Sequence, residues 1–141
     1  MDKYQRSILT ELQRDCRISI ADLAAKIGLS TTPCWRRIKE LEESGIIRRF
    51  TALLDRKKLN LGVCAFINVR LNHVDENAVE RFVREVFVLP QVLEIYETSG
   101  EYDFILKVVA TSIETFNDFQ HRVLLKIPGI AHMNSSFAMR E

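Results

Sequence analysis

The sequence predicts an α+β protein with two domains and a connecting segment. Apolar residues recur at helical spacing through the first part of the chain, whereas alternation of apolar and polar residues begins at Val63. The charge changes at the same place: residues 1–61 carry 13 Lys and Arg against 8 Asp and Glu, a net +5, and residues 62–141 carry 7 against 11, a net −4. We therefore expect a helical domain at 1–45, a linking strand and hinge at 46–61, and a second domain at 62–141.

The first two helices are predicted from apolar spacing and from residues suited to their ends. Tyr4, Ile8 and Leu12 repeat every four residues behind Asp2, which suits the N-cap position. Ser19 is the expected N-cap of the second helix, and Gly28 is suited to end it. The apolar face of this second helix comprises Ile20, Leu23, Ala24 and Ile27.

A third helix follows within the stretch "LSTTPCWRRIKELEESG" at residues 29–45. Thr32 is the expected N-cap, with Pro33 as the first helical residue, although Ser30 is also suited to cap the helix one turn earlier. The residues expected to face the core are Cys34, Ile38 and Leu41, and Gly45 is expected to end the helix. Two helices joined by a short turn at Gly28 form a helix-turn-helix.

The remaining elements are predicted from alternation and turn residues. "IIRRFTALLD" at 46–55 predicts a strand, and "RKKLNLG" at 56–62 predicts a linker. The expected elements beyond it are a strand at 63–71, a helix at 75–90, two strands at 91–110 around a Ser99-Gly100 turn, a helix at 111–129 opened by a capping box of Thr111 and Glu114, and a strand at 130–140. This βαββαβ order predicts a ferredoxin-like antiparallel sheet with both helices on one face.

The other face of that sheet is expected to need a cover. Phe66, Ile105 and Val109 fall on the strand faces opposite the residues that pack on the helices. A second copy of the chain is the expected cover, so the sequence predicts a homodimer. The alternative is an exposed sheet that tolerates scattered hydrophobic residues.

The start of the third helix has the chemistry of a DNA-reading element. In a helix-turn-helix, the N-terminal part of the second helix enters the major groove, where hydroxyls and backbone N–H groups bind phosphates or base edges and arginine can bind guanine. The residues expected to contact double-stranded DNA are Ser30, Thr31, Thr32, Pro33, Arg36, Arg37, Lys39, Arg48 and Arg49. Alternatives remain for three positions: the threonines can serve only as caps, Arg37 can pair with a carboxylate of the first two helices, and Trp35 can pack on the first helix.

Other function classes find little support in the sequence. Cys16, Cys34 and Cys64 lack CxxC spacing, and the three histidines have no metal-ligand spacing, so we expect neither a disulfide framework nor a metal site. No apolar run approaches the length of a membrane span, and no leader opens the sequence. The expectation is a cytoplasmic protein without a membrane partner.

Two stretches carry a resemblance to a known family. "SIADLAAKIGLSTTPCWRRIKELEESGIIRRFTALLD" resembles the helix-turn-helix and linking strand of the Lrp/AsnC feast/famine transcription regulators, and "TSGEYDFILKV" with "LLKIPGI" resembles their regulatory domain. The resemblance implies a regulator of amino-acid metabolism genes that senses a free amino acid, dimerises through its sheets and often assembles as an octamer of four dimers. Gln5, where the family usually has an acid, and Ser135, where it often has Thr, depart from the family pattern.

The effector site is expected at the loop "SGEYD". A free amino acid needs a carboxylate for its ammonium, N–H donors for its carboxylate and a side-chain pocket. The residues expected to bind the effector are Gly100, Glu101, Tyr102, Asp103 and Ser135, with leucine, methionine or another amino acid as the ligand. The alternative for this loop is a plain hairpin turn with solvated acids.

Two other functions remain as alternatives at this point. A few proteins of the resembled two-domain build are sirohaem decarboxylases, but no catalytic constellation is visible in this sequence. A protein-interaction module without DNA binding is the second alternative, and the basic Arg36, Arg37 and Lys39 argue against it. We expect no enzyme activity and no cofactor.

Overall fold

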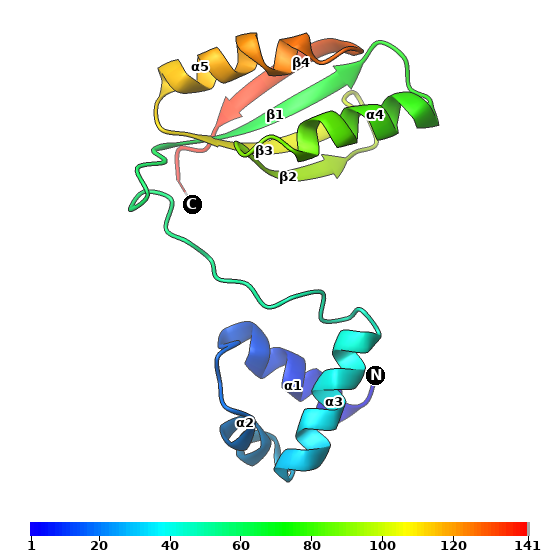
Figure 1. The fold of residues 1–141 in the computed structure, drawn as a ribbon, viewed down its shortest axis with the longest axis vertical. Coiled ribbons are helices and arrows are strands. Elements are labelled where there is room, and N and C mark those ends of the chain that lie inside the picture. Colours follow the sequence, from blue (N-terminus) through cyan, green and yellow to red (C-terminus); the bar gives the residue numbers. More distant parts are fainter. Residues whose placement is uncertain (141) are drawn as a thin grey trace. The chain divides into compact units, whose positions relative to one another are not determined.

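The computed structural model describes residues 1–140 and divides into two compact units (Figure 1). The first unit ends at Leu53 and the second begins at Leu54. The first contains helices α1 (Lys3–Arg14), α2 (Ile20–Ile27) and α3 (Thr31–Glu43). The second contains a four-stranded sheet and its helices, so the expected α+β class is confirmed. Within residues 1–140, no helix is long and apolar enough to cross a membrane.

Helix α1 begins with a capping box. The Oδ1 of Asp2 accepts the Gln5 N–H at 2.8 Å, and the Oε1 of Gln5 accepts the Asp2 N–H at 3.0 Å. The Gln5 side chain therefore accepts the Asp2 N–H as an acidic side chain would, and its departure from the family pattern leaves the cap intact.

The turn between α2 and α3 depends on one glycine. Gly28 has a φ of +72°, and its N–H donates to the carbonyls of Ala24 and Ala25, which ends α2 in the left-handed conformation that favours glycine. Ser30 is the N-cap of α3, so the preferred assignment of Thr32 was wrong and the alternative at Ser30 is confirmed. Pro33 still lies in the first turn of α3. Backbone N–H groups there have no partner within the helix, so the missing N–H of proline costs no hydrogen bond.

The three helices enclose a small apolar core. Its buried residues are Ile8, Leu23, Ala24, Cys34, Ile38 and Leu41. Burial raises the pKa of the Cys34 thiol, because the thiolate is poorly solvated there. The expectation for Ile20 was wrong: as the first residue of α2 it lies beyond the core and exposes 37% of its surface.

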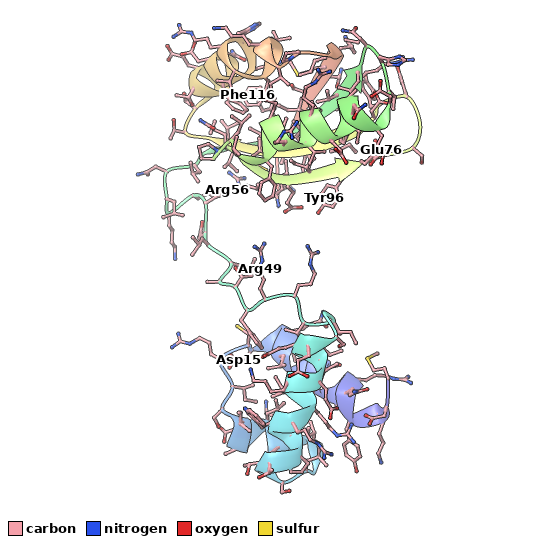
Figure 2. All side chains as sticks on the ribbon, turned by 45° about the vertical axis from the view of Figure 1, so that its right-hand side comes forward. Asp15, Arg49, Arg56, Glu76, Tyr96 and Phe116 are labelled. Carbon is pink, nitrogen blue, oxygen red and sulfur yellow. The ribbon has the colours of Figure 1, made fainter. Side chains whose placement is uncertain are left out.

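The segment after α3 is not a strand. Between Glu43 and Val63 the structure describes turns and irregular chain, so the strand expected at 46–55 is absent from a single copy of the chain. A strand requires a partner for its backbone N–H and C=O groups, and alternating sequence alone does not supply one. Arg49 and Arg56 both lie on this segment (Figure 2).

The second unit has the expected ferredoxin-like order. Its elements are β1 (Val63–Leu71), α4 (Glu76–Phe87), β2 (Val92–Glu97), β3 (Phe104–Ala110), α5 (Ile113–Arg122), a 3-10 turn (Leu124–Lys126) and β4 (Ile130–Phe137). The antiparallel sheet has the order β2-β3-β1-β4. Both α4 and α5 lie on one face of the sheet (Figure 1).

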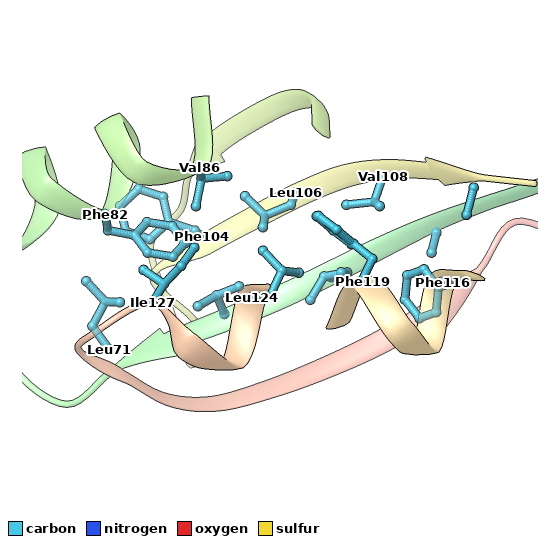
Figure 3. Close-up of a cluster of buried hydrophobic side chains, with 14 residues drawn as sticks. Leu71, Phe82, Val86, Phe104, Leu106, Val108, Phe116, Phe119, Leu124 and Ile127 are labelled. Atoms are coloured by element: carbon cyan, nitrogen blue, oxygen red, sulfur yellow. The ribbon is translucent and has the colours of Figure 1, made fainter. Parts of the chain in front are cut away.

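The main core fills the space between that face and the two helices. Figure 3 shows Phe82 and Val86 of α4 and Phe116 and Phe119 of α5 directed toward the strands. The strand residues that meet them are Ala65, Ile67, Val69 and Leu71 of β1 and Phe104, Leu106, Val108 and Ala110 of β3. Alternate residues of each strand are therefore buried, as the alternation in the sequence predicts.

The start and end of α5 differ from expectation. Ser112 is the N-cap and forms a capping box with Thr115, one residue beyond the expected pair of Thr111 and Glu114. The α-helix ends at Arg122 rather than continuing to Pro128, because Val123 leaves the regular helical path and a 3-10 turn follows. Val123 is half-buried and packs against the edge of the core.

The face of the sheet without helices is partly apolar. Phe66 exposes 40% of its surface there and Ile105 is half-buried. Val109 lies on the same face, opposite Cys64, but both are buried within the single chain, so the expectation that Val109 is exposed was wrong. Tyr96 of β2, which pairs with Ile105, exposes 55% of its surface, so Phe66 and Tyr96 are the large aromatic side chains left uncovered on this face among the described residues.

Candidate functional site

The exposed surface of α3 gathers the hydroxyl and basic residues named from the sequence. Ser30, Thr31 and Thr32 are exposed at the first turn of α3, and Pro33 is half-buried beside them. Arg36 lies one turn further along and exposes 69% of its side chain. The helix presents hydroxyls, unsatisfied N–H groups and a cation together, which is the donor set that DNA phosphates and base edges accept.

The basic residues of this surface pair with acids of the same helix. Arg36 Nε lies 3.6 Å from Glu40 Oε1, and Lys39 Nζ donates to Glu42 Oε2 at 2.7 Å. The Glu42 carboxylate raises the pKa of Lys39 above its ordinary value. Exposed pairs of this kind are weak, so either cation can exchange its partner for a phosphate at small cost.

Arg37 has a different environment from Arg36. Its guanidinium donates to the Oδ2 of Asp2 and lies over the Tyr4 ring, 5.5 Å from the ring centre, and only 22% of its side chain is exposed. The Gln5 N–H and the Arg37 guanidinium together hold the pKa of Asp2 below its ordinary value. Arg37 therefore joins α3 to the start of α1, the alternative left open by the sequence.

Trp35 lies outside the core of the first unit. Half of its surface is exposed, and with Ile20, Thr31 and Thr32 it lines a shallow pocket of about 210 Å³. The sequence left open that Trp35 packs on α1, but Trp35 is not among the residues of the first unit's core. Ile20 was missed as a surface residue because its helical spacing matched that of the core residues Leu23 and Ala24.

Arg48 and Arg49 follow α3 and are both exposed. They contribute to the wall of a larger pocket of about 460 Å³, whose apolar lining comes from α1, from Cys16 after it and from the segment after α3. Both arginines can reach a phosphate backbone, but nothing in the first unit fixes their side chains.

The expected effector loop joins β2 to β3 and comprises residues 98–103. It is longer than the two-residue turn of the alternative, and it is closed by the Thr98 N–H, which donates to the Asp103 carbonyl at 2.8 Å. Gly100 has a φ of +125°, a conformation that other residues rarely adopt. Glu101 is exposed, whereas Tyr102 is half-buried and stacks on His132 with 6.2 Å between ring centres.

Asp103 is held by the adjacent strand. Its Oδ2 accepts the Leu71 N–H at 2.7 Å, and its own N–H donates to the Val69 carbonyl at 2.9 Å. The carboxylate thus extends the ladder between β1 and β3 by one hydrogen bond. Within residues 1–140, no hydrogen bond is made to its Oδ1.

Ser135 does not lie beside this loop in a single chain. It pairs with Ile67, four residues along β1 from Leu71, which corresponds to about 13 Å at the ordinary rise of a strand. Its Oγ is buried and has no hydrogen-bond partner among the described residues. One chain therefore brings Gly100, Glu101, Tyr102 and Asp103 together and leaves Ser135 apart.

Within residues 1–140, no group of three or more His, Cys, Asp or Glu is placed to hold a metal ion. His132 contacts the expected effector loop, a contact that the sequence analysis did not predict. Its strand register could have indicated it, because His132 pairs with Arg70 near the end of β1.

A helix-turn-helix with an exposed basic reading helix, followed by a ferredoxin-like unit, defines a DNA-binding protein with a separate regulatory domain. The family model of the Lrp/AsnC ligand binding domain matches residues 64–141, and that of the winged helix-turn-helix DNA-binding domain matches residues 1–48. The chain belongs to the Lrp/AsnC family of transcription regulators.

Individual relatives agree with this assignment. The chain is 38% identical to the DNA-binding transcriptional activator DecR of Escherichia coli K12, covering all of this chain and 93% of DecR. It is 33% identical to the leucine-responsive regulatory protein of the same organism, covering all of this chain and 86% of that protein. The crystal structure of the transcriptional regulator NMB0573 in complex with L-Met, from Neisseria meningitidis, superposes with a TM-score of 0.94 at 36% identity, covering all of this chain and 91% of NMB0573.

Proposed function

We propose that this chain controls genes of amino-acid metabolism by binding an operator through α3 and a free amino acid through its second unit. The observation that carries the proposal is the exposed start of α3, where hydroxyls and Arg36 lie together on an otherwise well-packed helix-turn-helix. The proposal places the protein in the cytoplasm, where the DNA and free amino acids are both present.

Within this proposal the basic residues have different roles. Ser30, Thr31, Thr32 and Pro33 approach the groove and Arg36 reads a base edge, while Lys39, Arg48 and Arg49 bind phosphates. Arg37 acts mainly by joining α1 to α3, because Asp2 and Tyr4 already occupy its guanidinium.

The amino acid is proposed to bind at the loop of residues 98–103. Gly100 exposes its backbone, and the Oδ1 of Asp103 and the exposed Glu101 offer negative charge to an ammonium group. Methionine is the first candidate, because the similar NMB0573 was crystallised with L-Met, and leucine is the second, from the name of the leucine-responsive relative.

Assembly completes the proposal. The partly apolar sheet face around Phe66 is proposed to pack against a second copy, and four such dimers to form an octamer. A neighbouring copy is proposed to complete the site, because one chain brings together only residues 100–103 of those named for it. Light scattering that shows a stable monomer of 16.3 kDa at micromolar concentration would contradict this part of the proposal.

An enzymatic role is the weaker alternative, since the named relatives are transcription regulators. The function is tested by incubating the full chain with a pool of random DNA duplexes and sequencing those that it retains. Enrichment of one sequence, with binding that weakens steeply as salt rises, supports a DNA-reading regulator. Retention of no particular sequence would contradict it and favour an interaction module or an enzyme.

A further inference from the structure

An apolar pocket lies on the same surface as the polar DNA-binding residues. Ile20 at the start of α2 and Thr31, Thr32 and Trp35 of α3 line this pocket of about 210 Å³. Trp35 exposes 50% of its surface and Ile20 exposes 37%, although both are large and apolar. Neither belongs to the core of the first unit. Large apolar side chains left uncovered in a small domain indicate a contact surface.

The surroundings of the pocket restrict what can occupy it. Arg36 lies directly after Trp35 and is largely exposed, and the hydroxyls of Ser30, Thr31 and Thr32 are exposed beside the pocket. These neighbours attract a polyanion and donate hydrogen bonds. On the edges of base pairs in the major groove, the only apolar group is the 5-methyl group of thymine.

We propose that Ile20, Trp35 and the methyl groups of Thr31 and Thr32 receive the 5-methyl group of a thymine, and so require that base at one position of each operator half-site. The inference rests on the proposed DNA-reading function and adds to it a specificity that hydrogen bonding does not provide. Arg36 selects a base by its polar edge, and the pocket beside it selects a second base by its methyl group.

The test uses the full chain and the duplex enriched from random DNA. Each thymine is replaced in turn by deoxyuridine, which removes the methyl group and leaves base pairing unchanged. We expect one replacement in a half-site to weaken binding about four-fold, the factor that corresponds to burial of one methyl group. The other replacements are expected to have little effect.

Two variants assign the effect to the pocket. In Trp35→Ala and in Ile20→Ala, the four-fold preference for thymine over uracil at that position is expected to fall to about one. Both residues lie outside the core but are partly covered, so each variant is expected to melt somewhat below the wild type, and binding is compared at a temperature where all the proteins are folded. Arg36→Ala is the matched control: it weakens binding to both duplexes and retains the preference.

Three outcomes would overturn the proposal. They are an enriched operator with no position sensitive to uracil, a preference that survives in both pocket variants, and a preference that is lost equally in Arg36→Ala. The first two leave the DNA-reading function standing, and the pocket would then serve another partner. Failure to enrich any duplex would instead remove the function and the inference together.

Discussion

Replacement of Asp103 separates a structural role from a ligand-binding role at the regulatory loop. Its Oδ2 accepts the Leu71 N–H at 2.7 Å, and Leu71 is buried. In Asp103→Ala this part-buried N–H loses its acceptor, which costs about 1–3 kcal/mol. For a unit of this size, each kcal/mol lowers the melting temperature by about 4–8 °C.

The assay is thermal unfolding of the full chain followed by circular dichroism, beside calorimetric titration of methionine and leucine. Asp103→Asn keeps an acceptor oxygen, so we expect a smaller loss of stability but weaker binding of the amino acid, because the charge is gone. Glu101→Ala is the control in the same loop: its side chain is exposed, and its melting should be unchanged. Wild-type melting of Asp103→Ala would refute the structural reasoning.

Three further predictions concern the first unit. Arg36→Ala should weaken operator binding by about 1–3 kcal/mol in a gel-shift titration and leave unfolding nearly unchanged; equal affinity would remove Arg36 from the readout. Arg37→Ala should instead lower stability, since its contact with the Tyr4 ring is worth about 0.5–1 kcal/mol, and leave the salt dependence of DNA binding as in the wild type. The Lys26 ammonium lowers the pKa of Glu11. The stabilisation of the folded state by this ion pair is therefore present at neutral pH and lost as the pH falls through that lowered pKa. The free energies of unfolding of Glu11→Gln and of the wild type, measured at several pH values, should become equal in acid.

Periodicity and capping residues predicted most of the fold. The five α-helices, the four strands and the buried sides of β1 and β3 follow from apolar spacing, because each element buries one face. Two caps lie one or two residues from the expected positions, at Ser112 and Ser30. The other errors occur where a local pattern depends on something outside it. The prediction of a strand at 46–55 was wrong because no neighbouring strand pairs with this segment. The prediction that Val109 is exposed was wrong because other parts of the same chain cover it.

The candidate sites were less predictable than the fold. The exposure of Arg36 follows from its position on α3, but the pairing of Arg37 with Asp2 joins residues 35 apart in the sequence and requires the packing of α1 on α3. Likewise, the sequence predicted that the Asp103 carboxylate binds a ligand. Only the strand register shows that this carboxylate also accepts the Leu71 N–H. Contacts between elements decide which side chains remain available.

We propose that one chain couples amino-acid binding to operator binding. The most direct test measures the affinity of the full chain for its enriched operator with and without saturating methionine or leucine, and the affinity for the same amino acid with and without the operator. Coupling is reciprocal, so the account predicts the same factor in both titrations, about 5–150-fold for ordinary coupling energies. An operator bound with equal affinity in the presence and absence of every free amino acid would contradict it.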